Sequence, residues 1–123
     1  MKVQNQIGIK EYRSGGFVGK YQKLIREVVI PYQYSVLNDK AQDTEKSHVI
    51  QNFVNAGRAL RGEDTADGFY GMVFQDSDLA KWLEAVAYSL SLSPDPELEN
   101  TADELIDIIA AAQDTDGYLN TYY

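Results

Sequence analysis

Asp76 and Asp78 are the two residues of this sequence whose type and spacing best suit chemistry on a carbohydrate. Glycosidases place two carboxyl groups across the bond that they cleave, and carboxylates also bind sugar hydroxyls. The same two residues stand where a helix is expected to begin, and there a carboxylate often accepts backbone N–H groups as an N-cap. Their spacing favours the capping role, while sugar binding and acid–base catalysis remain open.

The counts of histidine and cysteine exclude several other kinds of chemistry. The 123 residues contain no cysteine, which excludes a thiol nucleophile, a zinc–thiolate site, an iron–sulfur cluster and a disulfide framework within them. His48 is the single histidine, so a two-histidine metal site is impossible and a Ser-His-Asp triad has to use this residue. A lone histidine at the start of a helix is more often structural than catalytic. We therefore predict a structural role for His48.

The sequence Asp114-Thr115-Asp116-Gly117 matches the first half of a calcium-binding loop. The glutamate that such a loop requires further on is missing, because Asn120 and Thr121 supply no carboxylate. A helix end that runs into a turn explains the four residues equally well, and this is the structure that we expect.

The net charge of −8 is concentrated in the second half of the chain. Residues 1–60 carry nine basic and five acidic side chains, a balance of +4, whereas residues 61–123 carry two basic and fourteen acidic ones, a balance of −12. Such an acidic surface repels phosphate groups, so we expect neither a nucleic acid nor a membrane as partner. No apolar run is long enough to span a bilayer and the first residues do not form a signal peptide, so the expected location is cytoplasmic.

The elements that must position these residues are predicted to be helices. From Phe17 onward, apolar residues recur at helical spacing. The apolar face of this first helix comprises Tyr21, Leu24, Ile25, Val28 and Tyr32. Pro31 must kink the helix or divide it, because its ring clashes with the preceding turn and its nitrogen donates no hydrogen bond. Residues 3–9 predict a short extended lead-in, and Asn38-Asp39 marks the end of the helix.

A second helix is predicted from about Thr44 to Leu60, with Thr44 or Asp43 as its N-cap. Its apolar face comprises Val49, Ile50, Phe53, Val54, Ala56 and Leu60. Residues 61–75 lack helical periodicity and contain several of the glycines and aspartates that are typical of loops. The aromatic and apolar residues 69–74 predict either a buried extended segment or a loop that its aromatic side chains fix in the core.

The third and fourth helices have the clearest predicted boundaries. The third begins at residues 76–78 and ends at residues 91–93. The fourth begins with Asp95 as N-cap and Pro96 as its first residue, and Gly117 is expected as the C′ glycine after its end. The predicted buried residues are Leu79, Trp82, Leu83, Val86 and Leu90 in the third helix and Leu98, Ala102, Leu105, Ile106, Ile109 and Ala112 in the fourth. The short connection between them predicts an antiparallel hairpin, so the fold class is all-α.

Four stretches of the chain match a known family. The longest is GMVFQDSDLAKWLEA at residues 71–85, and VVIPYQYSVLND stands at residues 28–39. Within residues 46–57 the matching segments are Lys-Ser-His, Asn-Phe and Ala-Gly. Within residues 95–121 they are Asp-Pro-Glu-Leu-Glu and Asp-Gly-Tyr-Leu-Asn-Thr. Over about residues 20–123 the chain thus resembles glycoside hydrolase family 127, whose characterised members are β-L-arabinofuranosidases.

The resemblance implies a retaining exo-glycosidase with an (α/α)6 barrel, or toroid, built of helical hairpins and followed by β-sandwich domains. Its nucleophile is a zinc-bound cysteine thiolate, and all of those residues lie beyond the stretch matched here. Residues 1–123 are therefore expected to be the N-terminal portion of the catalytic domain, with the rest of the domain missing. We expect zinc in the full-length enzyme, no cofactor in this chain, and no hydrolysis by this chain alone.

The resemblance also implies where sugar is bound. In such toroids the site lies at one mouth of the barrel, and the start of the third helix should share a mouth with the end of the fourth, because the two are antiparallel. We expect Gln42, Asp76, Asp78 and Tyr118 to bind an arabinose-containing carbohydrate there. Two alternatives remain: a related toroid enzyme acting on another sugar, and a non-catalytic helical binding module.

Overall fold

The computed structural model describes residue 8, residues 12–65 and residues 68–122. Its elements are α1 (Gly16–Leu24), η2 (Ile25–Val29), α2 (Ile30–Leu37), α3 (Val49–Leu60), α4 (Asp76–Leu92) and α5 (Pro96–Ala111). No strand occurs in the described ranges, so the predicted all-α class is confirmed. The predicted lead-in at residues 3–9 lies, except for Gly8, outside the described residues.

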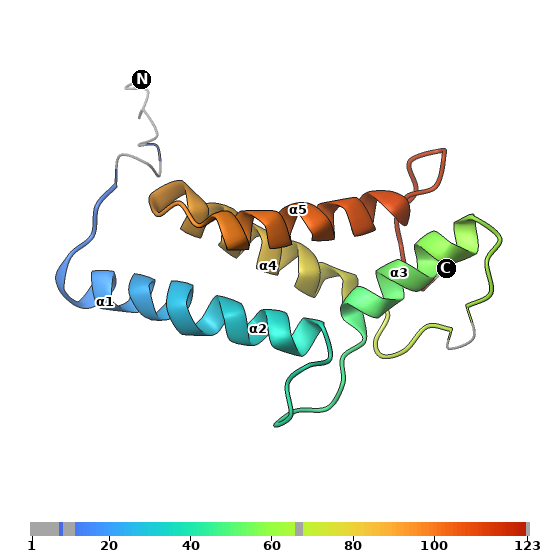
Figure 1. Cartoon of the computed structure of the whole chain (residues 1–123), viewed down its shortest axis with the longest axis horizontal. Coiled ribbons are helices and arrows are strands. Elements are labelled where there is room, and N and C mark those ends of the chain that lie inside the picture. Colours follow the sequence, from blue (N-terminus) through green and yellow to red (C-terminus); the bar gives the residue numbers. More distant parts are fainter. Residues whose placement is uncertain (1–7, 9–11, 66–67, 123) are drawn as a thin grey trace, which may run out of the picture.

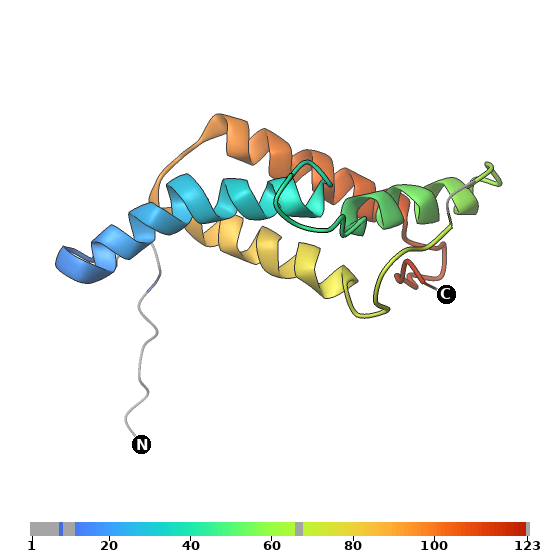
Figure 2. The ribbon, with the colours of Figure 1, turned by 90° about the horizontal axis from the view of Figure 1, so that it is seen from below.

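The first helix passes Pro31 by changing its hydrogen-bond pattern. α1, η2 and α2 follow one another in a nearly continuous rod (Figures 1 and 2). The η2 segment is a π-helix, in which the Ile30 N–H donates to the Ile25 carbonyl, five residues back. Pro31 is the second residue of α2 and follows directly after the π-helical turn. Sequence reasoning predicted the interruption at Pro31 but not its π-helical form.

The core lies where α4 packs against α2, α3 and α5, and α3 also packs against α5. Its buried apolar residues are Ile30, Leu37, Val49, Ile50, Phe53, Leu79, Trp82, Val86, Ala102, Leu105 and Ala112. α4 and α5 run antiparallel side by side, as predicted (Figure 1). The Trp82 indole N–H donates to the Ile30 carbonyl at 3.0 Å, which satisfies the one polar atom of this side chain inside the core. Ile106 does not belong to the buried stripe as predicted, because 52% of it is exposed.

The apolar stripe of the first helix is largely exposed in this chain. Its predicted members each expose 43–54% of their surface, and Phe17 exposes 73%. Only Ile30 and Leu37 of the α1–α2 rod are buried. The predicted helix with one apolar face is therefore present, but no described element covers this face.

The second helix begins later than predicted. α3 starts at Val49, and neither Asp43 nor Thr44 caps it. His48 adopts the left-handed conformation (φ 54°), which a right-handed helix cannot include, and so the helix begins directly after it. Asp43 instead accepts a hydrogen bond from the Tyr32 hydroxyl at 3.2 Å. Partial desolvation and then this bond raise the pKa of Tyr32 above its usual value.

The ends of α3 and α5 meet closely. A Cβ atom at Gly57 would lie 3.0 Å from the carbonyl oxygen of Ala111, so the backbone of α3 lies directly against that of α5. Gly117, predicted as the C′ glycine, lies beyond the helix end, since α5 stops at Ala111. It occupies a separate tight turn (φ 92°), in which its N–H donates to the Asp114 carbonyl at 2.9 Å. Within the described ranges, no helix combines the length and apolarity needed to cross a bilayer.

Candidate functional site

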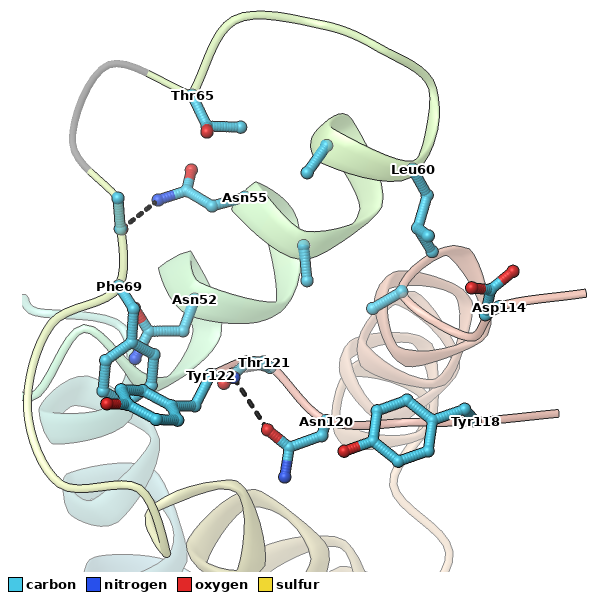
Figure 3. A pocket seen from close by; sticks show the side chains of 14 residues that line it. Asn52, Asn55, Leu60, Thr65, Phe69, Asp114, Tyr118, Asn120, Thr121 and Tyr122 are labelled. Atoms are coloured by element: carbon cyan, nitrogen blue, oxygen red, sulfur yellow. Dashed lines mark hydrogen bonds between the residues drawn. The ribbon is translucent and has the colours of Figure 1, made fainter. Parts of the chain in front are cut away.

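Two hollows lie on either side of α3, at the end of the bundle where the three long loops gather. The Tyr118 hollow, of about 370 Å³, is enclosed by α3, the 61–75 loop and the C-terminal segment (Figure 3). The His48 hollow, of about 550 Å³, is enclosed by α3, the 38–48 loop and the 61–75 loop. Asn52, Asn55 and Gly68 belong to both walls, so one thin partition separates the two hollows.

Asn52 builds this partition by binding the backbone of the 61–75 loop. Its side chain is 2% exposed, the only polar residue buried to this degree among the described residues. Its amide oxygen accepts the Tyr70 N–H at 3.1 Å and its amide nitrogen donates to the Tyr70 carbonyl at 2.8 Å. A neighbouring amide, Asn55, donates to the Gly68 carbonyl at 3.1 Å. Two amides on one face of α3 thus hold the loop in place.

Phe69 and Tyr70 point toward different hollows from this fixed segment. Phe69 lines the Tyr118 hollow, and its ring lies edge-on to that of Tyr122 with 5.0 Å between centroids (Figure 3). Tyr70 lines the His48 hollow, edge-on to the His48 ring at 4.6 Å. Successive side chains of an extended segment alternate in direction, so one backbone clamp at Tyr70 sets both rings. The predicted core segment 69–74 is therefore a loop held by α3, and most of its side chains are exposed rather than buried.

His48 is fixed through Asp39. One carboxylate oxygen of Asp39 accepts the His48 backbone N–H at 2.9 Å, and the other lies 2.8 Å from the imidazole Nδ1. The two residues close the 38–48 loop at its base. This bidentate contact also holds His48 in its left-handed conformation, the feature that delays the start of α3.

Asp76 is engaged in a long-range contact and does not cap the helix. Its two oxygens accept the Thr121 N–H at 2.9 Å and the Thr121 hydroxyl at 2.6 Å. Gln75 occupies the N-cap position of α4 without a side-chain cap, so the capping role that spacing favoured is wrong for Asp76. The contact joins the start of α4 to the segment that follows α5, which are the two ends that the antiparallel hairpin was expected to bring together. By contrast, the predicted N-cap Asp95 is confirmed, since it accepts the Leu98 N–H at 3.1 Å.

The other predicted site residues lie in different places. Tyr118 lines the hollow that carries its name and is 52% exposed. Asp78 lies in the groove between α2 and α4 and pairs with Lys81 at 3.3 Å. Gln42 is exposed in the 38–48 loop and lines neither hollow. Only Tyr118 and, through Thr121, Asp76 share one neighbourhood.

The Asp114–Gly117 turn uses its carboxylates locally. Asp114 accepts from the Thr115 N–H at 2.6 Å, and Asp116 accepts from the Tyr118 N–H at 2.8 Å. Over the described parts of the chain, no group of three histidine, cysteine or acidic side chains is placed to hold a metal ion.

Sequence reasoning missed Asn52 and Asp39 as organisers of the site. Asn52 lies within the predicted apolar stretch of the second helix, and a polar residue at that position is itself a signal, because a buried amide requires partners. The sequence indicates Asp39 only as part of the end of the first helix. Its link to His48 depends on how the 38–48 loop folds back, which local spacing does not reveal.

Antiparallel helical hairpins whose polar and aromatic loops gather at one end are the arrangement expected for part of an α/α toroid. Residues 13–123 match the family described as β-L-arabinofuranosidase, GH127 catalytic domain. The chain belongs to glycoside hydrolase family 127. As predicted from its sequence, its hairpins correspond to the first part of an α/α toroid.

Three relatives document this membership. The non-reducing end β-L-arabinofuranosidase of Bifidobacterium longum subsp. longum is 46% identical over 111 residues, covering 80% of this chain and 16% of that protein. The crystal structure of a GH127 β-L-arabinofuranosidase from Geobacillus stearothermophilus T6 matches with a TM-score of 0.80 and 54% identity, over 89% of this chain and 16% of that one. A further GH127 β-arabinofuranosidase matches with a TM-score of 0.71 and 32% identity, over 85% of this chain and 15% of that one. The chain thus spans about a sixth of the length of these relatives.

Proposed function

We propose that this chain forms the first hairpins of the catalytic domain of a β-L-arabinofuranosidase, and that the rest of the domain lies outside these 123 residues. The observation that carries the proposal is the match to the Geobacillus enzyme, with a TM-score of 0.80 at 54% identity. The exposed apolar stripe of α1, η2 and α2 supports it, because such a face is the kind that a neighbouring hairpin covers.

The substrate of the whole protein is a β-L-arabinofuranoside, cleaved at its non-reducing end with retention of configuration. The nucleophile is a cysteine thiolate with a zinc ion, and both belong to parts of the protein beyond this chain. The absence of cysteine from these residues, together with their single histidine, supports that division. Zinc bound to a thiolate keeps the sulfur deprotonated and ready for attack.

This chain contributes part of the mouth in which the sugar is bound. Of the four residues expected to contact sugar, Tyr118 is best placed, because its half-exposed ring lines a hollow that also contains amide side chains. Asp76 acts through Thr121, whose position it fixes at the wall of the same hollow. Gln42 and Asp78 contact sugar only if the remainder of the barrel lies beside them.

A chimaera tests the proposal directly. Residues 13–123 replace the corresponding segment of the Geobacillus enzyme, and hydrolysis of p-nitrophenyl β-L-arabinofuranoside is measured alongside the parent enzyme. We expect the chimaera to keep kcat/KM within about tenfold of the parent, since the folds match and the nucleophile is untouched. The chain alone is expected to release no nitrophenol.

Circular dichroism and the melting temperature of the chimaera provide the control for folding. A chimaera that folds like the parent but hydrolyses nothing contradicts the proposal. A folded chimaera that has lost the arabinofuranoside but gained another glycoside supports the alternative of a toroid enzyme with a different sugar specificity.

A further inference from the structure

The second hollow, beside His48, has no role in the function proposed above. Its lining comprises Asp39, Lys46, His48, Gln51, Asn52, Asn55, Gly68 and Tyr70. Polar atoms form most of its surface, and its volume of about 550 Å³ falls within the range of small-molecule sites.

The bond to Asp39 determines which nitrogen of His48 is available. The carboxylate lies 2.8 Å from Nδ1, so in the neutral ring Nδ1 carries the proton and Nε2 is an acceptor. No hydrogen bond joins Nε2 to any described residue, and the His48 side chain is 32% exposed. The same carboxylate also accepts the His48 backbone N–H, so both the backbone and Nδ1 of His48 are held in place. Nε2 is then the ring nitrogen left to accept from a ligand in the hollow that His48 lines.

The amides in the hollow are already committed to the protein. Asn52 binds both the backbone N–H and the backbone C=O of Tyr70. Asn55 donates to the Gly68 carbonyl, and Gln51 donates to the Asn55 oxygen at 2.9 Å. The groups left for a ligand therefore include the acceptor Nε2 of His48, the ammonium of the exposed Lys46 and the Tyr70 ring, which is 53% exposed. An acceptor next to an exposed aromatic ring suits a ligand that has hydroxyl groups and an apolar face.

We propose that the His48 hollow binds a sugar ring, whose hydroxyl donates to His48 Nε2 and whose apolar face packs on Tyr70. The inference rests on the proposed function and names a second carbohydrate subsite for it, separated from the Tyr118 hollow by Asn52. The lining contains one carboxylate, Asp39, and one ammonium, Lys46, so their charges balance and favour a neutral glycoside as the occupant.

The single histidine makes the site directly observable. In the chain labelled with 15N- and 13C-histidine, every ring signal belongs to His48. We expect the Nδ1–H tautomer, and a saturable shift of the ring signals during titration with methyl β-L-arabinofuranoside. Ring signals that stay unchanged up to the solubility limit of the glycoside overturn the proposal. A shift caused equally by inorganic phosphate also overturns it, because phosphate detects an anion site.

Two tyrosines of similar exposure provide the matched variants. Tyr70→Ala should raise the Kd of the glycoside about tenfold, whereas Tyr70→Phe, which keeps the ring, should leave it within about twofold. Tyr88→Ala removes a ring that is 51% exposed on α4 and should leave the Kd unchanged. Equal Kd values for Tyr70→Ala and Tyr88→Ala contradict the role given to Tyr70, and the Phe variant keeps this test valid if the alanine variant unfolds.

The results of the histidine titration and of the chimaera distinguish failure of the second subsite from failure of the proposed function. An active chimaera combined with an unresponsive His48 refutes the second subsite alone. An inactive but folded chimaera combined with a saturable His48 shift refutes the arabinofuranosidase assignment and leaves a sugar-binding hollow.

Discussion

The helical half of this molecule and its loop end are held together by different forces. Around Trp82 and Leu79 the helices of the core contact one another through buried apolar side chains. The removal of these side chains from water stabilises the contact. At the loop end, three side chains bind backbone groups far away in sequence: Asp39 to His48, Asn52 to Tyr70, and Asp76 to Thr121. Apolar packing is spread over many contacts and tolerates small adjustments of each one. Each of these three polar contacts, here called polar clamps, depends on one or two hydrogen bonds or ion pairs with a fixed geometry.

The largest effect is expected from a change in the core. Leu79 is completely buried, so Leu79→Ala should lower the free energy of unfolding by about 3–5 kcal/mol, through lost burial and the cavity left behind. Urea denaturation followed by tryptophan fluorescence measures it. Leu119→Ala removes the same atoms at a residue of the loop end that is 41% exposed, and should change the free energy by less than about 1 kcal/mol. Similar losses in the two variants would mean that the two regions do not differ as described.

The next effect concerns the partition between the hollows. Asn52→Ala leaves the Tyr70 N–H and C=O without their partners, and should destabilise the chain by about 2 kcal/mol. Hydrogen exchange at the Tyr70 amide should accelerate far more than exchange in α4, because the loop opens locally. Asn55→Ala removes one bond to the loop, at Gly68 (3.1 Å), together with the exposed bond from Gln51 within α3, and serves as the control. Uniform acceleration over the whole chain would argue against a local clamp.

A third comparison separates the two aspartates at the start of α4. Asp76→Ala removes two hydrogen bonds to Thr121 and should cost about 1–3 kcal/mol. Asp78→Ala removes an exposed ion pair with Lys81 and should cost less than about 1 kcal/mol. Both variants lose one negative charge near the same helix N-terminus, so the macrodipole contribution is similar and the difference in melting temperature reports the contact with Thr121. A larger loss from Asp78→Ala would restore capping as the main role of this pair.

The smallest effect is expected at an exposed ion pair after α3. The hydrogen bond from Arg61 holds the pKa of the Glu63 carboxyl below its usual value. A carboxyl whose pKa is lower in the folded chain stabilises it above the unfolded pKa, and this stabilisation is lost as the pH falls through the folded pKa. Glu63→Gln should therefore abolish a small decrease in melting temperature between neutral and acidic pH. An identical pH dependence in both proteins would show that the pair contributes nothing.

The sequence was sufficient for most of the core that α4 and α5 form. Leu79, Trp82 and Val86 recur at helical spacing, and the structure buries all three. Asp95 could be recognised as an N-cap because the residues that it contacts are its immediate neighbours. Local pattern and local contact coincide in α4 and α5, so both helices were predicted with their correct hairpin arrangement.

The polar clamps could not be derived in this way. Asp76 has the spacing of a cap, yet its partner is Thr121, 45 residues further on. The start of α3 was misplaced for a similar reason, because the conformation of His48 depends on Asp39 across a loop. Periodicity reports which residues are apolar together, and it contains no information on which distant backbone group a carboxylate accepts from.

The π-helical turn between α1 and α2 has a consequence for the direction in which the first rod presents its side chains. An α-helix rotates by about 100° per residue, and a π turn holds one residue more than an α turn, so the side chains on its two sides differ in angular phase by roughly that amount. The residues after the turn, Ile30 and Leu37, face α4, while Phe17 and Tyr21 before it are rotated away. One rod therefore has two apolar faces that point in different directions, one packed on α4 and the other exposed among the described residues.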